Sequence, residues 1–182
     1  MPVLVRRVTK GALWAAAKDP SKWAGDNFPY ELLSELSEKT GPGISFWEVS
    51  SRRDPMLKRV AAALVLRTGG EARQVQSVDF RCMPASYPGT LGIAVSATDG
   101  RTSDQSINGL HREITGISGP QAVALAKRLC MSPSVAFGTS EVARFIVEGL
   151  RGGRLSETSI TKDMLSSLKG YGAVKVIMPP KK

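Results

Sequence analysis

The only histidine of the chain, His111, lies two residues before a carboxylate, Glu113. On a strand these two side chains project from the same face, because successive residues point to opposite faces. A histidine beside a carboxylate can act as a general base, and Arg101 or Arg112 could hold the phosphate that ribonuclease-type chemistry requires. The alternative is a structural histidine that donates a hydrogen bond to a neighbour near a turn. His111 and Glu113 are therefore the candidate catalytic residues.

Three carboxylates, Asp99, Asp104 and Glu113, could bind a magnesium ion if the segment between them folded back, since hard cations bind clustered oxygens. Asp99 precedes Gly100, however, and this pair is a hairpin-turn signal that explains the aspartate without a ligand. We expect no metal ion and no cofactor, because the sequence contains no phosphate-loop motif, no Gly-x-Ser-x-Gly and no metal-ligand spacing.

Paired basic residues are a second kind of candidate site. Arg52 and Arg53 precede an expected helix, where loop arginines can bind phosphate together with the backbone amides of the first turn. Lys127 and Arg128 form another pair, near the end of an expected helix. The alternative for each pair is a solvated surface with no ligand.

The net charge of +9 and the isoelectric point near 9.9 favour polyanionic partners. The charge is unevenly spread. Residues 26–50 carry one basic and five acidic side chains, whereas residues 126–182 carry ten basic and four acidic ones. Nucleic acid, either DNA or RNA, is therefore the expected partner, although a surplus of lysine and arginine also occurs in soluble proteins without such a partner.

Composition also argues against several classes of protein. Cys82 and Cys130 have no cysteine or histidine near them in the sequence, so neither a disulfide framework nor a zinc site is predicted. The longest uncharged apolar run, residues 60–66, is far shorter than the roughly 20 residues that span a bilayer. The amino terminus lacks the order of a secretory signal. We expect an intracellular, cytoplasmic protein without membrane association.

Helices and strands must position these candidate residues, and hydrophobic periodicity together with helix-capping and turn residues predicts where they lie. Residues 3–8 are expected to form an edge strand. The other expected strands are residues 44–49, 74–83, 90–97, 110–115, 135–137 and 173–178. The expected helices are residues 12–18, 30–39, 54–67, 118–131, 140–150 and 162–169.

This order of elements predicts an α+β fold, with a mostly antiparallel sheet packed by helices and a helical carboxy-terminal portion. We expect an α+β domain over residues 1–116. Residues 117–182 would form the helical portion and pack against the first domain as one unit.

The carboxy-terminal order of helix, short extended piece, two further helices and a final strand resembles a winged-helix or helix-turn-helix module. The segment ITKDMLSSLKGYGAVKV, residues 160–176, resembles a recognition helix that leads into a wing strand. The resemblance implies that the last helix enters the major groove and that Arg151 and Arg154 contact phosphates. The residues that would then face DNA are Thr161, Lys162, Ser166, Ser167 and Lys169. The connection between residues 150 and 161 is longer than the usual helix-turn-helix turn, and small helical bundles that contact only protein share this pattern.

The sequence therefore favours a non-catalytic, nucleic-acid-associated protein that regulates or belongs to a larger complex. One alternative is a protein-interaction subunit that docks through the acidic helix 30–39 and Trp23. Another is a small nuclease-type enzyme that uses His111. The sequence does not decide the oligomeric state.

Overall fold

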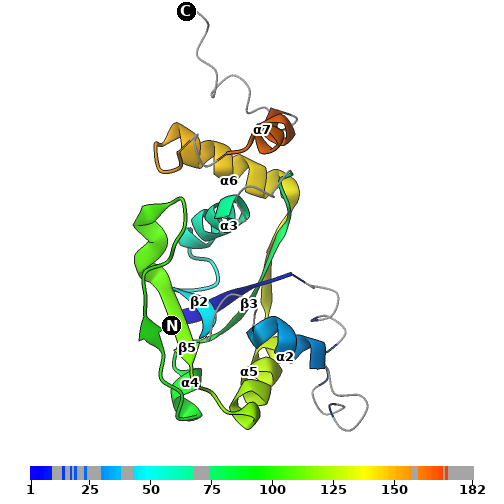
Figure 1. Ribbon diagram of the computed structural model, residues 1–182, viewed down its shortest axis with the longest axis vertical. Helices are drawn as coiled ribbons and strands as arrows, with labels where there is room; N and C mark the ends of the chain where they lie inside the picture. Colours follow the sequence, from blue (N-terminus) through cyan, green and yellow to red (C-terminus); the bar gives the residue numbers. More distant parts are fainter. Residues whose placement is uncertain are drawn as a thin grey trace, which may run out of the picture. The chain divides into compact units, whose positions relative to one another are not determined.

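The computed structural model describes residues 1–9, 14, 17, 19, 23, 30–37, 43–67, 74–156, 160–169 and 171 (Figure 1). Its strands are β1 (Val3–Val8), β2 (Gly43–Val49), β3 (Val78–Pro84), β4 (Ser96–Ala97), β5 (His111–Thr115) and β6 (Ser134–Phe137). Its helices are α2 (Tyr30–Ser37), α3 (Met56–Arg67), α4 (Tyr87–Thr90), α5 (Gly119–Met131), α6 (Thr139–Arg151) and α7 (Lys162–Lys169), with a 3-10 helix η3 (Gln105–Leu110).

The strands form one six-stranded sheet in the order β4-β5-β2-β1-β3-β6. β1 pairs antiparallel with both β2 and β3, and β5 pairs antiparallel with both β2 and β4. The sheet and the helices confirm the predicted α+β fold.

The prediction that residues 3–8 form an edge strand is wrong, because β1 lies inside the sheet between β2 and β3. Arg6 explains the error, since a charged residue in a short strand suggests a solvent-exposed position. Here Arg6 is buried, and its guanidinium donates hydrogen bonds to the carbonyl oxygens of Ser45 at 3.0 Å and Leu36 at 3.3 Å. These bonds pair both terminal nitrogens of the guanidinium, and such pairing lowers the cost of burying its charge.

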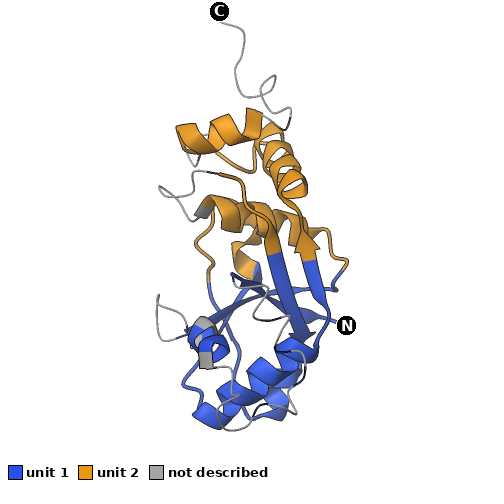
Figure 2. Ribbon diagram, turned by 90° about the vertical axis from the view of Figure 1, so that its right-hand side faces the viewer, with its two compact units in different colours: residues 1–52, 79–98, 110–135 blue, residues 53–78, 99–109, 136–182 orange. Residues whose placement is uncertain are grey.

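By contact density the chain divides into two compact units, which Figure 2 colours separately. Unit 1 comprises residues 1–52, 79–98 and 110–135, and unit 2 comprises residues 53–78, 99–109 and 136–182. Each unit is thus built from three separate stretches of sequence. The predicted division into residues 1–116 and 117–182 stays a prediction.

Helices α2 and α5 cover one face of the sheet in unit 1 (Figure 1). Leu32 and Leu36 of α2, and Leu125 and Leu129 of α5, are at most 1% exposed. They pack in one core with the side chains on that face of the sheet: Leu4, Val8, Ile44, Phe46, Met83 and Ile114. The buried leucines recur four residues apart, which is the spacing of one face of a helix.

The capping residues that fix the helix starts are present. Asp54 Oδ1 accepts a hydrogen bond from Met56 N at 2.8 Å, and Thr161 Oγ1 caps α7 in the same way at 3.1 Å. Ser118 and Gln121 form a capping box in which each side chain bonds to the backbone of the other. These oxygens satisfy amides that a helix leaves without a partner, which is why α3, α5 and α7 begin close to the predicted positions.

Two parts of the predicted sheet differ from the structure. The expected strand over residues 90–97 is reduced to the short β4, because α4 precedes it and Gly92 adopts φ +67°, a conformation that interrupts an extended strand. Arg81, which alternation places on a polar face, is only 7% exposed and lies opposite Arg6.

Several expected elements lie outside the described residues. They are the final strand over residues 173–178, most of the helix over residues 12–18, and the end of the helix 30–39. Within the part of the chain that is described, none of the helices combines the length and the apolar character needed to cross a membrane.

Candidate functional site

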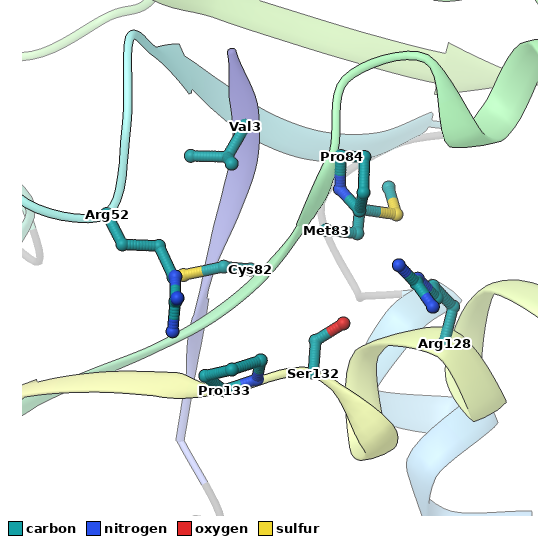
Figure 3. Close-up of a pocket in the computed structure, with 8 residues that line it drawn as sticks. All are labelled: Val3, Arg52, Cys82, Met83, Pro84, Arg128, Ser132 and Pro133. Carbon is teal, nitrogen blue, oxygen red and sulfur yellow. The ribbon is translucent and has the colours of Figure 1, made fainter. Parts of the chain in front are cut away.

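A pocket in unit 1 brings together two of the predicted nucleic-acid contacts, Arg52 and Arg128 (Figure 3). Its volume is about 150 Å³. Arg52 approaches the pocket from one side and Arg128 from the other, with Ser132 and Pro133 between them. The other residues that line it are Val3, Cys82, Met83 and Pro84.

Different elements hold the two arginines. Arg52 follows β2 and is exposed, whereas Arg128 lies in the last turn of α5 and is half-buried. The guanidinium carbon of Arg128 lies 5.3 Å from the centroid of the Tyr87 ring, a cation–π contact that orients the side chain without neutralising it. Arg128 Nε is buried and has no hydrogen-bond partner among the described residues.

Apolar side chains make up most of the pocket lining, and its two arginines are the charged residues of the described lining. Among the described residues that line it there is no aspartate or glutamate, and neither Arg52 nor Arg128 forms an ion pair with a carboxylate of that part of the chain. Burial raises the pKa of the Cys82 thiol to about 11, although the charges of Arg52 and Arg81 act in the opposite direction. The thiol is therefore neutral near pH 7 and does not offset the two guanidinium charges.

The same reasoning removes both cysteines as nucleophiles. Cys130 is 3% exposed, and burial raises its pKa to about 11, against the opposing charge of Arg81. A protonated, buried thiol reacts slowly, because the thiolate is the nucleophile.

The sequence prediction does not include Ser132 and Cys82 as site residues. For Ser132 the sequence does contain a signal, the Ser-Pro pair that ends α5. The chain turns at this pair, and Ser132, which is 8% exposed, lines the pocket as a result. No local signal identifies Cys82, since its place in the pocket depends on strand pairing.

The basic candidates at the carboxy-terminal end lie in unit 2. Lys162, Ser166 and Lys169 are exposed and share one face of α7, while Met164 and Leu168 are buried on the other. Their spacing of four and three residues places them one above another on the helix.

Arg151 and Arg154 are also exposed, at the end of α6 and just beyond it. The side chain of Ser167 is turned inward instead, and its Oγ accepts a hydrogen bond from Val75 N at 3.2 Å. The expectation that Ser167 faces DNA is therefore not supported by its position.

The remaining basic candidates do not join the pocket. Arg53 is exposed and Lys127 is half-buried, and neither is among the residues that line the pocket. The two sequence pairs are thus separated by the fold, which places only one member of each pair at the pocket.

His111 is buried in unit 1 and has structural partners. Its Nδ1 lies 2.6 Å from Thr98 Oγ1, and its ring packs edge-on against Trp47 at 5.1 Å between centroids. The Glu113 carboxylate lies instead against Gly43, where an added Cβ would clash with it. These contacts are those of a core histidine rather than of a general base paired with Glu113.

The carboxylate of Asp104 forms an ion pair with Arg59. Arg59 Nε donates to Asp104 Oδ2 at 3.0 Å, and Arg59 Nη2 donates to Oδ1 at 2.9 Å, so the ion pair is bidentate. Ser106 also donates to this carboxylate. Nowhere in the described ranges do three histidine, cysteine, aspartate or glutamate side chains gather as a metal site would require.

The expected docking surface of α2 and Trp23 is only partly described. Trp23 is half-buried and packs against the core of unit 1 instead of standing free as an anchor. Glu31 is exposed on α2. Glu38, another residue of the expected acidic face, lies outside the described residues.

Comparison with known proteins adds no identification. The chain matches no protein-family model, and neither the curated proteins nor the solved structures contain a significant match.

Proposed function

We propose that this chain is a non-catalytic nucleic-acid-binding protein that contacts phosphates through unit 2. The exposed cations of α7 and of the end of α6 carry the proposal. Lys162 and Lys169 flank Ser166 on one exposed face, and Arg151 and Arg154 are exposed as well. Such side chains release counterions from a nucleic-acid backbone when they bind it.

The distribution of charge between the units supports the same surface. Unit 2 holds fourteen basic and eight acidic side chains, whereas unit 1 holds eleven and eight. Unit 2 therefore carries most of the positive surplus of the chain. Because electrostatic attraction grows with local charge, a polyanion is expected to bind unit 2 first.

The winged-helix resemblance gives this proposal a finer form. In that form α7 lies in the major groove of duplex DNA, where Ser166 and the lysines contact the bases or phosphates. Binding to single-stranded RNA through the same cations is the alternative, and preference for one of the two nucleic acids decides between them.

Fluorescence anisotropy at low salt tests the proposal with labelled duplex DNA and single-stranded RNA. The double variant Lys162→Gln/Lys169→Gln is expected to weaken binding about tenfold or more, since each lost phosphate contact costs affinity. The matched control is Arg101→Gln/Arg144→Gln, which removes two exposed charges elsewhere in unit 2.

The control variant is expected to weaken binding much less than the α7 variant. Equal losses in both would mean that only net charge matters and would remove α7 as the interface. Absence of binding to either nucleic acid at low salt would end the proposal.

A further inference from the structure

We propose that the pocket of unit 1 is a binding site for a phosphate monoester. This inference does not rest on nucleic-acid binding by unit 2, because the two sites use different residues of different units. The ligand would bind between the side chains of Arg52 and Arg128, beside the hydroxyl of Ser132 (Figure 3).

Charge is the first argument. Two arginines line the pocket, no carboxylate is among its described lining residues, and burial keeps the Cys82 thiol neutral. A phosphate monoester carries a charge of about −1.5 to −2 near pH 7, so it balances two arginines better than a monoanion does. The forked donors of arginine also match the oxygens of a phosphate.

Available donors are the second argument. Arg128 Nε is buried without a hydrogen-bond partner among the described residues, which is a costly state for a charged group. The face of the Tyr87 ring orients the Arg128 side chain through a cation–π contact. This contact uses none of the conventional hydrogen bonds of the guanidinium. The guanidinium is therefore oriented in advance. Because Nε is covered by protein atoms, an anion in the pocket would bind the two terminal nitrogens of this group.

Size is the third argument. A cavity of roughly 150 Å³ holds a molecule of the size of benzene, and a phosphate group is no larger. A complete nucleotide does not fit. The pocket therefore suits the terminal phosphate of a ligand whose remaining part stays outside.

Two sources could provide this group: the 5′-phosphate of a nucleic-acid strand, or a small phosphorylated molecule. The chemistry recognised in the pocket is the same for both. A phosphodiester of the nucleic-acid backbone differs from both, because it carries one charge and is esterified on two sides.

Titrations followed by NMR, with the Nε–Hε signals of the arginines as reporters, test the site directly. Methyl phosphate is expected to bind with a dissociation constant of about 1 mM or tighter. Dimethyl phosphate, which models the backbone diester, is expected to bind about tenfold more weakly, since it offers one charge instead of two. Only the signals of Arg52 and Arg128 should shift with saturation.

Variants provide matched controls within the two basic pairs. Arg52→Gln and Arg128→Gln are each expected to lower the affinity for methyl phosphate about tenfold, because each variant loses a hydrogen bond to a charged group. Arg53→Gln and Lys127→Gln remove the neighbouring charges outside the pocket and should change affinity less than about twofold. Arg52 is exposed, so its variant remains informative if Arg128→Gln fails to fold.

Oligonucleotides with and without a 5′-phosphate distinguish the two sources of the phosphate. Their affinities are measured with the Lys162→Gln/Lys169→Gln variant, in which binding through α7 is weakened. Tighter binding of the 5′-phosphorylated strand, lost in Arg52→Gln, identifies a strand end. Equal binding of both strands, with methyl phosphate still bound, identifies a small phosphorylated molecule. Absence of saturable binding of methyl phosphate, or equal losses in the pocket and control variants, would overturn the proposal.

Discussion

Two arginine–carboxylate pairs of unit 2 differ in their surroundings. Asp104 has a side chain that is 4% exposed and takes two hydrogen bonds from Arg59. Arg144 and Glu148 form a pair on α6 at 3.8 Å, with side chains that are 62% and 55% exposed. Solvent screens the exposed pair, whereas the buried carboxylate depends on its partner. The first pair should therefore stabilise the protein much more than the second.

Replacing Asp104 with Asn tests this difference. The change leaves Arg59 without its charged acceptor and is expected to lower the free energy of unfolding by about 2 kcal/mol. Glu148→Gln is the matched control and should lower it by less than about 0.5 kcal/mol. Urea denaturation measures both values. Equal losses in the two variants would show that Asp104 contributes no more than a surface carboxylate.

The pH dependence of the same variant gives a second measurement. Burial alone would raise the pKa of Asp104, but hydrogen bonds from Arg59 and Ser106 and the Arg59 charge outweigh it, so the pKa lies below 3.8. A lowered carboxyl pKa stabilises the folded state above the unfolded value, and this stabilisation is lost as pH falls through the folded value. The wild-type protein and Asp104→Asn should therefore converge in stability below about pH 4.

Helix α6 lies close to the segment that follows it in the sequence. Gly149 lies in the last turns of α6, and a Cβ added there would come within 2.5 Å of Leu155 Cδ1. The Gly149 carbonyl also accepts hydrogen bonds from the backbone amides of Arg154 and Leu155. The segment after α6 therefore folds back onto the helix at the one position where the helix has no side chain.

Gly149→Ala sets two effects against each other. Alanine is favoured over glycine in a helix by about 1 kcal/mol, but the clash with Leu155 costs about 1–3 kcal/mol. We expect the clash to be the larger effect, so the free energy of unfolding should fall. A double-mutant cycle with Leu155→Ala checks the cause, because Gly149→Ala should be less harmful once Leu155 is shortened. A gain in stability in the single variant would contradict the proposed close contact.

For the whole molecule, the net charge of +9 matters through its distribution. The positive surplus lies mainly in unit 2, where four predicted nucleic-acid contacts, Arg151, Arg154, Lys162 and Lys169, are exposed. Binding that depends on such contacts weakens with salt in proportion to the number of phosphates neutralised.

The affinity for duplex DNA should therefore fall with salt. The slope of log K against log salt concentration is expected to be roughly −3 to −4, if the four side chains each neutralise one phosphate. Lys162→Gln/Lys169→Gln should reduce the magnitude of this slope by about two, whereas Arg52→Gln should leave it unchanged. Anisotropy titrations at several salt concentrations measure the slope. Affinity that does not change with salt would contradict phosphate contacts altogether.

The sequence alone determined the elements that depend on local interactions. Asp54, Ser118 and Thr161 cap helices that begin close to the predicted positions, because a cap involves only neighbouring residues. The strand β2 also follows from β-branched and aromatic residues within a short segment. The α+β class follows from these elements.

Only the tertiary structure decided where β1, His111 and the arginines lie. β1 is central because residues far along the chain pair with it on both sides, and no local pattern reports such pairing. Strand pairing also places His111 beside Trp47, where its contacts are structural. The pocket joins Arg52 and Arg128, each separated from its sequence neighbour, because strands and a helix that are distant in sequence meet there. The sequence thus identified basic residues, and long-range packing selected which of them form a site.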